Sequence, residues 1–268
     1  MTTWKPQHDS EVLLDFGIAK IRSVPYPVSN RWLFYRVLQA GLIPDKSYID
    51  KFDYVTSRAR KEFYGEWRPD TLIDSVRRCY FEGEYEAYFH VQLDSITEQD
   101  RYIQIWFEAE AMHGQFEHYT ATYRVSLIPF RGDLSIPMKW QIAKKLEEIA
   151  KKYDKPLQIL YFGDYDKKGF QIIESAIRDI KAWCKTDFSI ERIGLTLEQA
   201  KAFNLPENPD HPNAYQWEAL DDAQAKQLIL DSLNRYVKPT STELTERENT
   251  LKAKIKTSML QIIKEATL

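Results

Sequence analysis

The feature that most constrains this chain's fold is a short apolar run that ends at two acids and precedes a helix. The run covers residues 157–162, and Asp164 and Asp166 follow it. Gly169 comes next, and residues 170–183 then carry apolar side chains at helical spacing. A continuous apolar run of this length is typical of a strand buried on both faces. Strand, loop and helix in this order predict one unit of a parallel α/β sheet.

The middle of the chain repeats this alternation. We predict strands over 101–107, 123–129, 157–162 and 188–193, and helices over 137–153 and 170–183. Strands separated by helices favour a mainly parallel, Rossmann-like sheet, so the fold class is α/β. Ligands of such sheets bind at the carboxyl ends of the strands, which makes that edge the expected functional one.

The two flanks of this sheet look mainly helical. On the N-terminal side we predict helices over 31–40, 47–63 and 70–77, then a strand or wing over 85–93. Short helices followed by a hairpin are typical of a winged-helix-like DNA-binding domain. On the C-terminal side we predict helices over 197–203, 221–236 and 243–266. The expected domains are therefore 1–96, 97–195 and a mostly helical extension over 196–268.

Charge is unevenly distributed along the chain. The formal net charge is -3, so the protein as a whole is not a polycation. Residues 20–78, however, hold twelve Lys or Arg against seven Asp or Glu, a net of +5. A basic module beside an acidic pocket is compatible with binding of a phosphate backbone and metal-assisted chemistry. A solvated helix face explains the same excess equally well.

Cysteine content and hydropathy indicate the compartment. Cys79 and Cys184 are the two cysteines of the chain, and their spacing fits no zinc motif. This usage suits a reducing environment, so we expect a cytoplasmic protein of a prokaryote or phage. No run of about 18 apolar residues occurs, so no membrane partner is expected.

Acidic side chains follow two of the expected strands. Glu108 ends the first strand, and Asp164 and Asp166 end the third. Because parallel strands end at one edge of a sheet, these carboxylates can converge there. Oxygen ligands favour Mg²⁺ or Mn²⁺ over zinc. The alternative is that the Asp-x-Asp pair only caps the next helix.

Other polar residues nearby are more ambiguous. Glu110 either shares the metal-binding role or lies in solvent on a following helix. His113 and His118 are five residues apart, which fits no firm ligand pattern, so we interpret both as ordinary polar residues.

These residues resemble the Toprim domain of topoisomerases and primases. Glu108 matches the glutamate that follows its first strand, and Asp164-x-Asp166 matches its Asp-x-Asp. The trailing Gly169 is similar to the version in the topoisomerase VI A subunit. Arg131-Gly132 lies where that group carries Lys-Gly, and we expect Arg131 to contact DNA.

The order of modules also resembles the topoisomerase VI A subunit and its meiotic double-strand-break relative, which place a winged-helix domain before Toprim. Arg31-Trp32-Leu33-Phe34-Tyr35 is similar to their nucleophile motif, with Tyr35 at the position of the nucleophile and Arg31 at that of the supporting arginine. Trp32 replaces the usual acid. The resemblance covers about residues 25–195.

This resemblance implies a DNA transesterase that uses Mg²⁺ or Mn²⁺ and leaves a 5′-phosphotyrosyl link. It further implies a homodimer, in which the tyrosine of one protomer works with the metal site of another. No glycine-rich ATP-binding loop occurs in the sequence, so strand passage driven by ATP would need a separate ATPase subunit.

Two other functions remain open on the same residues. Metal-activated water could attack the phosphodiester, which would make the protein a Toprim nuclease. Alternatively, the protein binds DNA or assembles a complex around a vestigial metal site. Tyr35 shares an apolar helical stripe, so packing explains it as well as catalysis. Arg58 and Arg60 either contact phosphates or lie in solvent.

Overall fold

The computed structural model describes residues 4–73, 91–208 and 211–266, and its centre is a four-stranded sheet. The strands are β1 (Tyr102–Phe107), β2 (Ser126–Pro129), β3 (Leu157–Phe162) and β4 (Ser189–Gly194). They lie in the order β2-β1-β3-β4, and all three pairings are parallel. The predicted α/β class and parallel sheet are confirmed.

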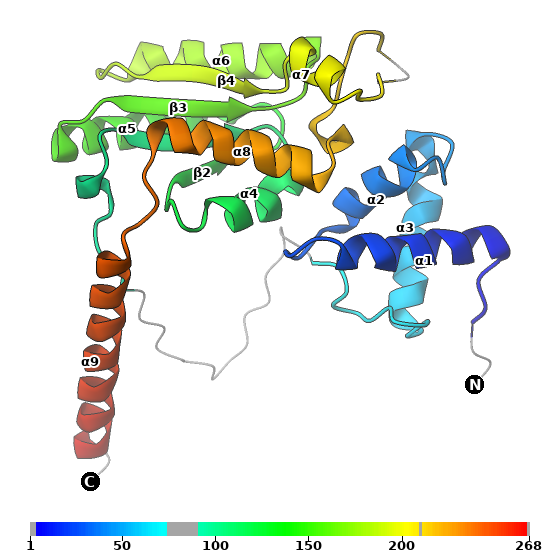
Figure 1. Cartoon of the computed structure of the whole chain (residues 1–268), viewed down its shortest axis with the longest axis horizontal. Coiled ribbons are helices and arrows are strands. Elements are labelled where there is room, and N and C mark those ends of the chain that lie inside the picture. The colour runs from blue at the N-terminus through cyan, green and yellow to red at the C-terminus, as the bar shows by residue number, and fades with distance from the viewer. Residues whose placement is uncertain (1–3, 74–90, 209–210, 267–268) are drawn as a thin grey trace.

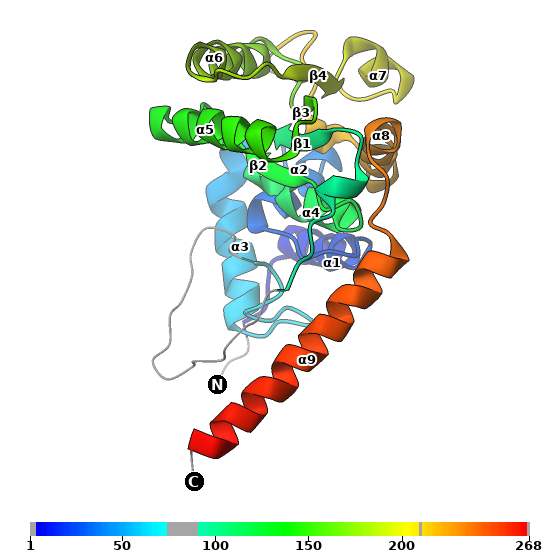
Figure 2. The same cartoon turned by 90° about the vertical axis from the view of Figure 1, so that its left-hand side faces the viewer.

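Helices cover both faces of this sheet. Helices α5 (Ile136–Tyr153) and α6 (Lys167–Trp183) pack on one face, where Leu146 is fully buried in the apolar core of that side. Helices α4 (His113–Thr120) and α8 (Asp222–Tyr236) pack on the other face. Figure 2 shows the strands between these two helical layers. The two central strands, β1 and β3, are buried along their whole length, which explains their mainly apolar sequences.

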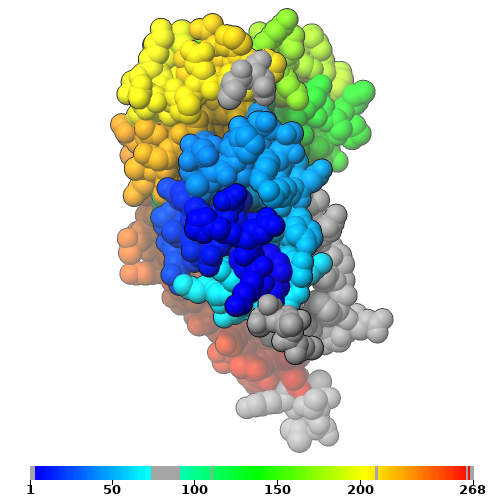
Figure 3. Space-filling model, turned by 90° about the vertical axis from the view of Figure 1, so that its right-hand side faces the viewer, coloured from blue at the N-terminus to red at the C-terminus, as the bar shows by residue number. Residues whose placement is uncertain are grey.

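The N-terminal part forms a third core of its own. Helices α1 (His8–Arg22), α2 (Asn30–Gln39) and α3 (Ile49–Lys61) enclose the buried rings of Trp32 and Trp67. Helix α2 begins close to the predicted position, because the Ser29 side chain accepts a hydrogen bond from the Trp32 backbone N–H. Figure 1 shows these helices beside the carboxyl ends of the strands, and Figure 3 looks onto that side, with the N-terminal helices in blue.

Several predicted bounds differ from the structure. Helix α6 starts at Lys167, three residues before the prediction, because the Asp166 side chain caps it by accepting from the Gly169 N–H. Strand β2 starts at Ser126 rather than at 123, since Arg124 has a left-handed backbone with a φ of 53°. Helix α1 was not predicted from the sequence.

The helix predicted over 70–77 is wrong for its described part. Residues 70–73 form turns and a bridge, in which the Ile73 N–H donates to Val28 O. Residues 74–77, and residues 85–90 of the predicted strand or wing, lie outside the described residues. Residues 91–93 have no regular secondary structure.

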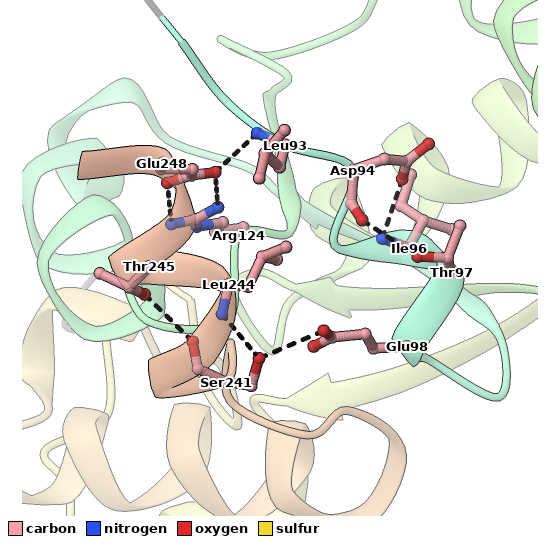
Figure 4. Close-up of polar contacts among 10 residues, drawn as sticks. All are labelled: Leu93, Asp94, Ile96, Thr97, Glu98, Arg124, Ser241, Leu244, Thr245 and Glu248. Carbon is pink, nitrogen blue, oxygen red and sulfur yellow. Dashed lines mark hydrogen bonds and ion pairs between the residues drawn. The ribbon is translucent and has the colours of Figure 1, made fainter. Parts of the chain in front are cut away.

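The C-terminal segment is helical, as predicted. It contains α7 (Leu197–Ala202), α8 and α9 (Thr242–Ala266). Helix α9 extends away from the sheet domain (Figures 1 and 2). Its first turns are held by Glu248, whose carboxylate accepts two hydrogen bonds from Arg124, at 2.5 and 2.7 Å, and one from the Leu93 N–H (Figure 4).

The helices and the cysteines of the described residues were predicted on sequence grounds as well. None of their helices combines the length and the apolar character that a membrane crossing requires. Cys184 is a free thiol, and Cys79 lies outside the described residues.

Candidate active site

Glu108, Asp164 and Asp166 lie together at the carboxyl edge of the sheet. Strands β1 and β3 pair in register up to Phe107 and Phe162, so the residues after them are neighbours. The Asp164 N–H donates to Glu108 Oε2 at 3.0 Å. Asp166 is held by its capping bond to the Gly169 N–H, at 2.6 Å. The structure therefore brings the three predicted carboxylates into one cluster.

Two glycines make room for this cluster. A Cβ atom at Gly169 would lie 2.6 Å from Asp164 O and 2.9 Å from Glu108 Oε2. A Cβ atom at Gly163 would lie 2.8 Å from the same Glu108 oxygen. These distances are shorter than van der Waals contact, so any side chain at these positions would displace the Glu108 carboxylate or the loop.

The carboxylates disfavour one another's charge. Burial raises the pKa of Asp164 well above its usual value, and the negative charges of Glu218, Glu108 and Asp166 raise it further. Burial also raises the pKa of Glu108, with added contributions from Asp166 and Glu218. Nearby charge of opposite sign would remove this penalty.

The side chains of this cluster carry oxygen donors of the type that divalent cations bind. Each of the three carboxylates uses one oxygen to accept a backbone N–H, from Asp164, Trp217 or Gly169, which leaves the second oxygen available. Oxygen donors are those that Mg²⁺ and Mn²⁺ prefer. As the side chains are placed, the described residues include no group of three or more His, Cys, Asp or Glu that could hold a metal ion.

A cleft of about 810 Å³ connects this cluster with the N-terminal helices. Glu108, Asp164 and Asp166 line it together with Tyr35 and Arg31 of α2. Its other charged lining residues are Lys46, Arg60, Arg131, Lys168 and Glu218. The cleft therefore combines carboxylates at the sheet edge with lysines and arginines from several elements, which suits a phosphate backbone beside a metal ion.

Tyr35 lies within electrostatic reach of this cluster. Burial raises the pKa of Tyr35, the Arg31 charge lowers it, and Glu218 and Asp164 raise it again. Arg31 donates to Tyr35 Oη at 3.4 Å, and Lys46 Nζ lies 5.9 Å from the centre of the ring. The resemblance implies a tyrosine paired with another protomer's metal site. Here the tyrosine and the carboxylates of a single chain share one cleft.

Hydrogen bonds fix α2 to the sheet edge. Arg36, next to Tyr35, donates to Glu218 O at 2.8 Å and to Leu220 O at 2.6 Å. The neighbouring Trp217 N–H donates to Asp164 Oδ1 at 2.8 Å. The turn at 217–220 therefore joins the helix that carries the candidate nucleophile to a candidate metal ligand.

Of the three arginines that were predicted to contact DNA, two lie in the cleft and one lies outside it. Arg60 and Arg131 line the cleft. Arg58 does not; it faces a separate hollow on α3, where it donates to Tyr54 Oη and lies over the ring of Trp4.

The two histidines near the first strand take part in aromatic packing. His113 stacks on Phe107, and His118 packs against Tyr26 and Tyr119. Both histidines therefore pack against aromatic rings, and His113 Nδ1 is buried without a hydrogen-bond partner among the described residues. The side chain of Glu110 lies outside the described residues.

Sequence reasoning missed Glu218. It belongs to the short 3-10 turn Trp217–Ala219, far along the chain from the strand ends. No strand, glycine or repeated spacing precedes it, so nothing in the local sequence separates it from other acids. Lys46 and Lys168 were not singled out either, because lysines are common on solvated helix surfaces.

Comparisons of the chain with models of protein families, with curated proteins and with solved structures gave no match.

Proposed function

We propose that this protein is a metal-dependent DNA transesterase, with a Toprim sheet and a winged-helix-like N-terminal module similar to the topoisomerase VI A subunit. One observation carries the proposal: Tyr35 and Arg31 line the same cleft as Glu108, Asp164 and Asp166. A candidate nucleophile, a cation beside it and a set of oxygen ligands are the groups that this chemistry requires.

In the proposed reaction, Tyr35 Oη forms a bond to phosphorus and the bond from phosphorus to the 3′ oxygen breaks. The tyrosine proton passes to solvent water, and solvent water supplies the proton that converts the departing 3′ oxygen into a hydroxyl group. Arg31 stabilises the phenolate, which a free tyrosine with a pKa near 10 rarely forms at neutral pH. Glu108, Asp164 and Asp166 would hold Mg²⁺ or Mn²⁺, which supplies positive charge for the phosphate oxygens.

Lysines and arginines of the cleft have a separate role in this proposal. Lys46, Arg60 and Arg131 would contact phosphates on either side of the cleaved bond. In this proposal the nucleophile and the carboxylates of one chain act together, because both line the same cleft. A homodimer and a separate ATPase subunit remain proposals for strand passage alone.

A nuclease is the second candidate, and one observation favours it. Burial raises the pKa of Tyr35, which opposes its use as a nucleophile. In that case, water bound at the carboxylates would attack the phosphodiester, and Tyr35 would only help to shape the cleft.

One assay distinguishes these functions. Supercoiled DNA is incubated with the protein and Mn²⁺, and detergent is added before covalent adducts are measured. We expect adducts from the wild type and from the control Tyr153→Phe, whose hydroxyl bonds Asp94 outside the cleft. We expect none from Tyr35→Phe. Cleavage that persists in Tyr35→Phe but not in Asp164→Asn would establish the nuclease, and binding without cleavage would leave only the non-catalytic function.

A further inference from the structure

Helix α9 carries an apolar stripe on the part that extends away from the sheet (Figures 1 and 2). The stripe consists of Leu251, Ile255, Met259 and Ile262. These residues follow one another at intervals of four or three, which keeps their side chains on one side of the helix. Leu244 and Glu248 lie on the same side and are buried in the first turns. Of the described α9 side chains after Glu248, none is buried, so the stripe lies beyond the attachment of the helix.

The exposure of this stripe indicates a further helix as its partner. Leu251 is 41% exposed and Ile262 is 63% exposed. Helices in proteins owe most of their stability to packing of an apolar face. A narrow row of apolar side chains, three or four residues apart, is the seam along which two helices pack lengthwise. The stripe therefore fits another helix better than it fits solvent.

The charges beside the stripe favour a second copy of α9 as that helix. Arg247 and Glu265 are both exposed, and 18 residues separate them, which is about five turns, so they lie on the same flank of the stripe. In an antiparallel pair, the same flanks of the two helices face each other. Alignment of Leu251 with Ile262 of the second copy then brings Arg247 beside Glu265 of that copy. Two-fold symmetry forms this pair of opposite charges twice.

A parallel pair of α9 helices would bring like charges together instead. In that orientation, opposite flanks of the two helices face each other. Arg247 would then lie beside Lys252 of the second copy, which is five residues further along and on the other flank. Like charges at such positions destabilise helix pairing. The charge pattern therefore selects the antiparallel orientation.

We propose that α9 is a dimerisation helix, whose apolar stripe packs antiparallel against the same stripe of a second copy of this chain. Each α9 joins the rest of its own chain at its N-terminal end, through Glu248 and Arg124. An antiparallel pair therefore places the two sheet domains at opposite ends of the paired helices, where they do not collide. This inference goes beyond the proposed function and does not depend on it, because it uses no residue of the cleft.

Sedimentation equilibrium of the full chain tests this proposal with two variants of matched chemistry. Ile262→Glu places a charge in the stripe, whereas the control Leu260→Glu places it on another side of α9, at a residue that is 52% exposed. We expect a reversible dimer of the wild type, a dimer weakened about tenfold or more by Ile262→Glu, and no change in Leu260→Glu. A wild type that stays monomeric up to its solubility limit would overturn the proposal. So would a dimer that Ile262→Glu leaves intact, or one that both variants weaken equally.

One charge reversal tests the orientation of the pair by the sign of its effect. In the antiparallel pair, Arg247→Glu places like charges beside Glu265, so we expect it to weaken the dimer by about threefold or more. In a parallel pair, the same variant would place opposite charges beside Lys252 and strengthen the dimer. The double variant Arg247→Glu, Glu265→Arg should recover the wild-type affinity. If Arg247→Glu dimerises as tightly as the wild type or more tightly, the antiparallel arrangement is wrong.

Discussion

At the scale of single residues, the site places several carboxylates close together, which lowers the stability of the fold because their negative charges repel one another. Asp164 has a raised pKa because it is buried and faces other negative charges. Below the ordinary pKa of an aspartate, near 4, it is protonated in both the folded and the unfolded chain. As pH rises above this value, the Asp164 carboxyl group loses its proton in the unfolded chain before it does so in the folded chain. The free energy of unfolding therefore falls as pH rises toward the folded-state pKa.

Removing the Asp164 carboxyl group should therefore stabilise the fold at neutral pH. In chelator, Asp164→Asn should be more stable than the wild type at pH 7, because the variant lacks the carboxyl group whose ionisation is opposed by burial and by the neighbouring negative charges. The difference should shrink toward pH 4. Urea unfolding at a series of pH values measures it, with the exposed Asp231→Asn as control. Equal pH dependence in the wild type and Asp164→Asn would contradict it.

Residues differ in how far the sequence reveals them. Glu108, Asp164 and Asp166 directly follow apolar strands, so their convergence is predictable from a parallel sheet. Glu218 reaches the same cleft through bonds that its turn makes with Arg36 and Asp164, which are remote in sequence. Such long-range contacts leave no local pattern, and the sequence therefore did not indicate this residue.

At the scale of elements, local periodicity predicted most of the sheet and its helices. Strand β3 and helix α5 agree with the prediction to within one residue. Helix α1 was missed because its buried face includes Ser10 and Gly17 as well as leucines, which weakens the apolar pattern. The predicted helix over 70–77 fails where Ile73 bonds Val28, a contact that no periodicity reports.

The attachment of helix α9 depends on one buried glutamate. Glu248 is 3% exposed and bonds both Arg124 and the Leu93 N–H (Figure 4). Glu248→Gln should lower the free energy of unfolding by about 2 kcal/mol, because charge-assisted bonds are lost. The bond to Arg124 lowers the pKa of Glu248. Its contribution is therefore present above the ordinary glutamate pKa and is lost as pH falls through the folded-state pKa.

Urea unfolding near neutral pH measures this loss. The exposed Glu246→Gln on the same helix is the matched control and should be within about 0.5 kcal/mol of the wild type. A similar loss in both variants would mean that helix charge, and not the contact with Arg124, sets the stability.

At the scale of the whole molecule, the net charge of -3 does not reveal that one cleft is lined both by lysines and arginines and by carboxylates. Helix α3 offers a matched pair for testing which basic residues contact DNA. Arg60 lines the cleft, whereas Arg58 stacks over Trp4 on another side of the helix. Both were DNA-binding candidates on sequence alone, and only their positions separate them.

We expect Arg60→Gln, but not Arg58→Gln, to reduce the dependence of DNA affinity on salt. Each lost phosphate contact lowers the slope of log affinity against log salt by about 0.9. Fluorescence anisotropy with a labelled duplex measures the slope in a Tyr35→Phe, Asp164→Asn background, where cleavage is blocked. If Arg58→Gln lowers the slope as much as Arg60→Gln does, the phosphate backbone follows the outer face of α3 and the cleft is not the DNA path.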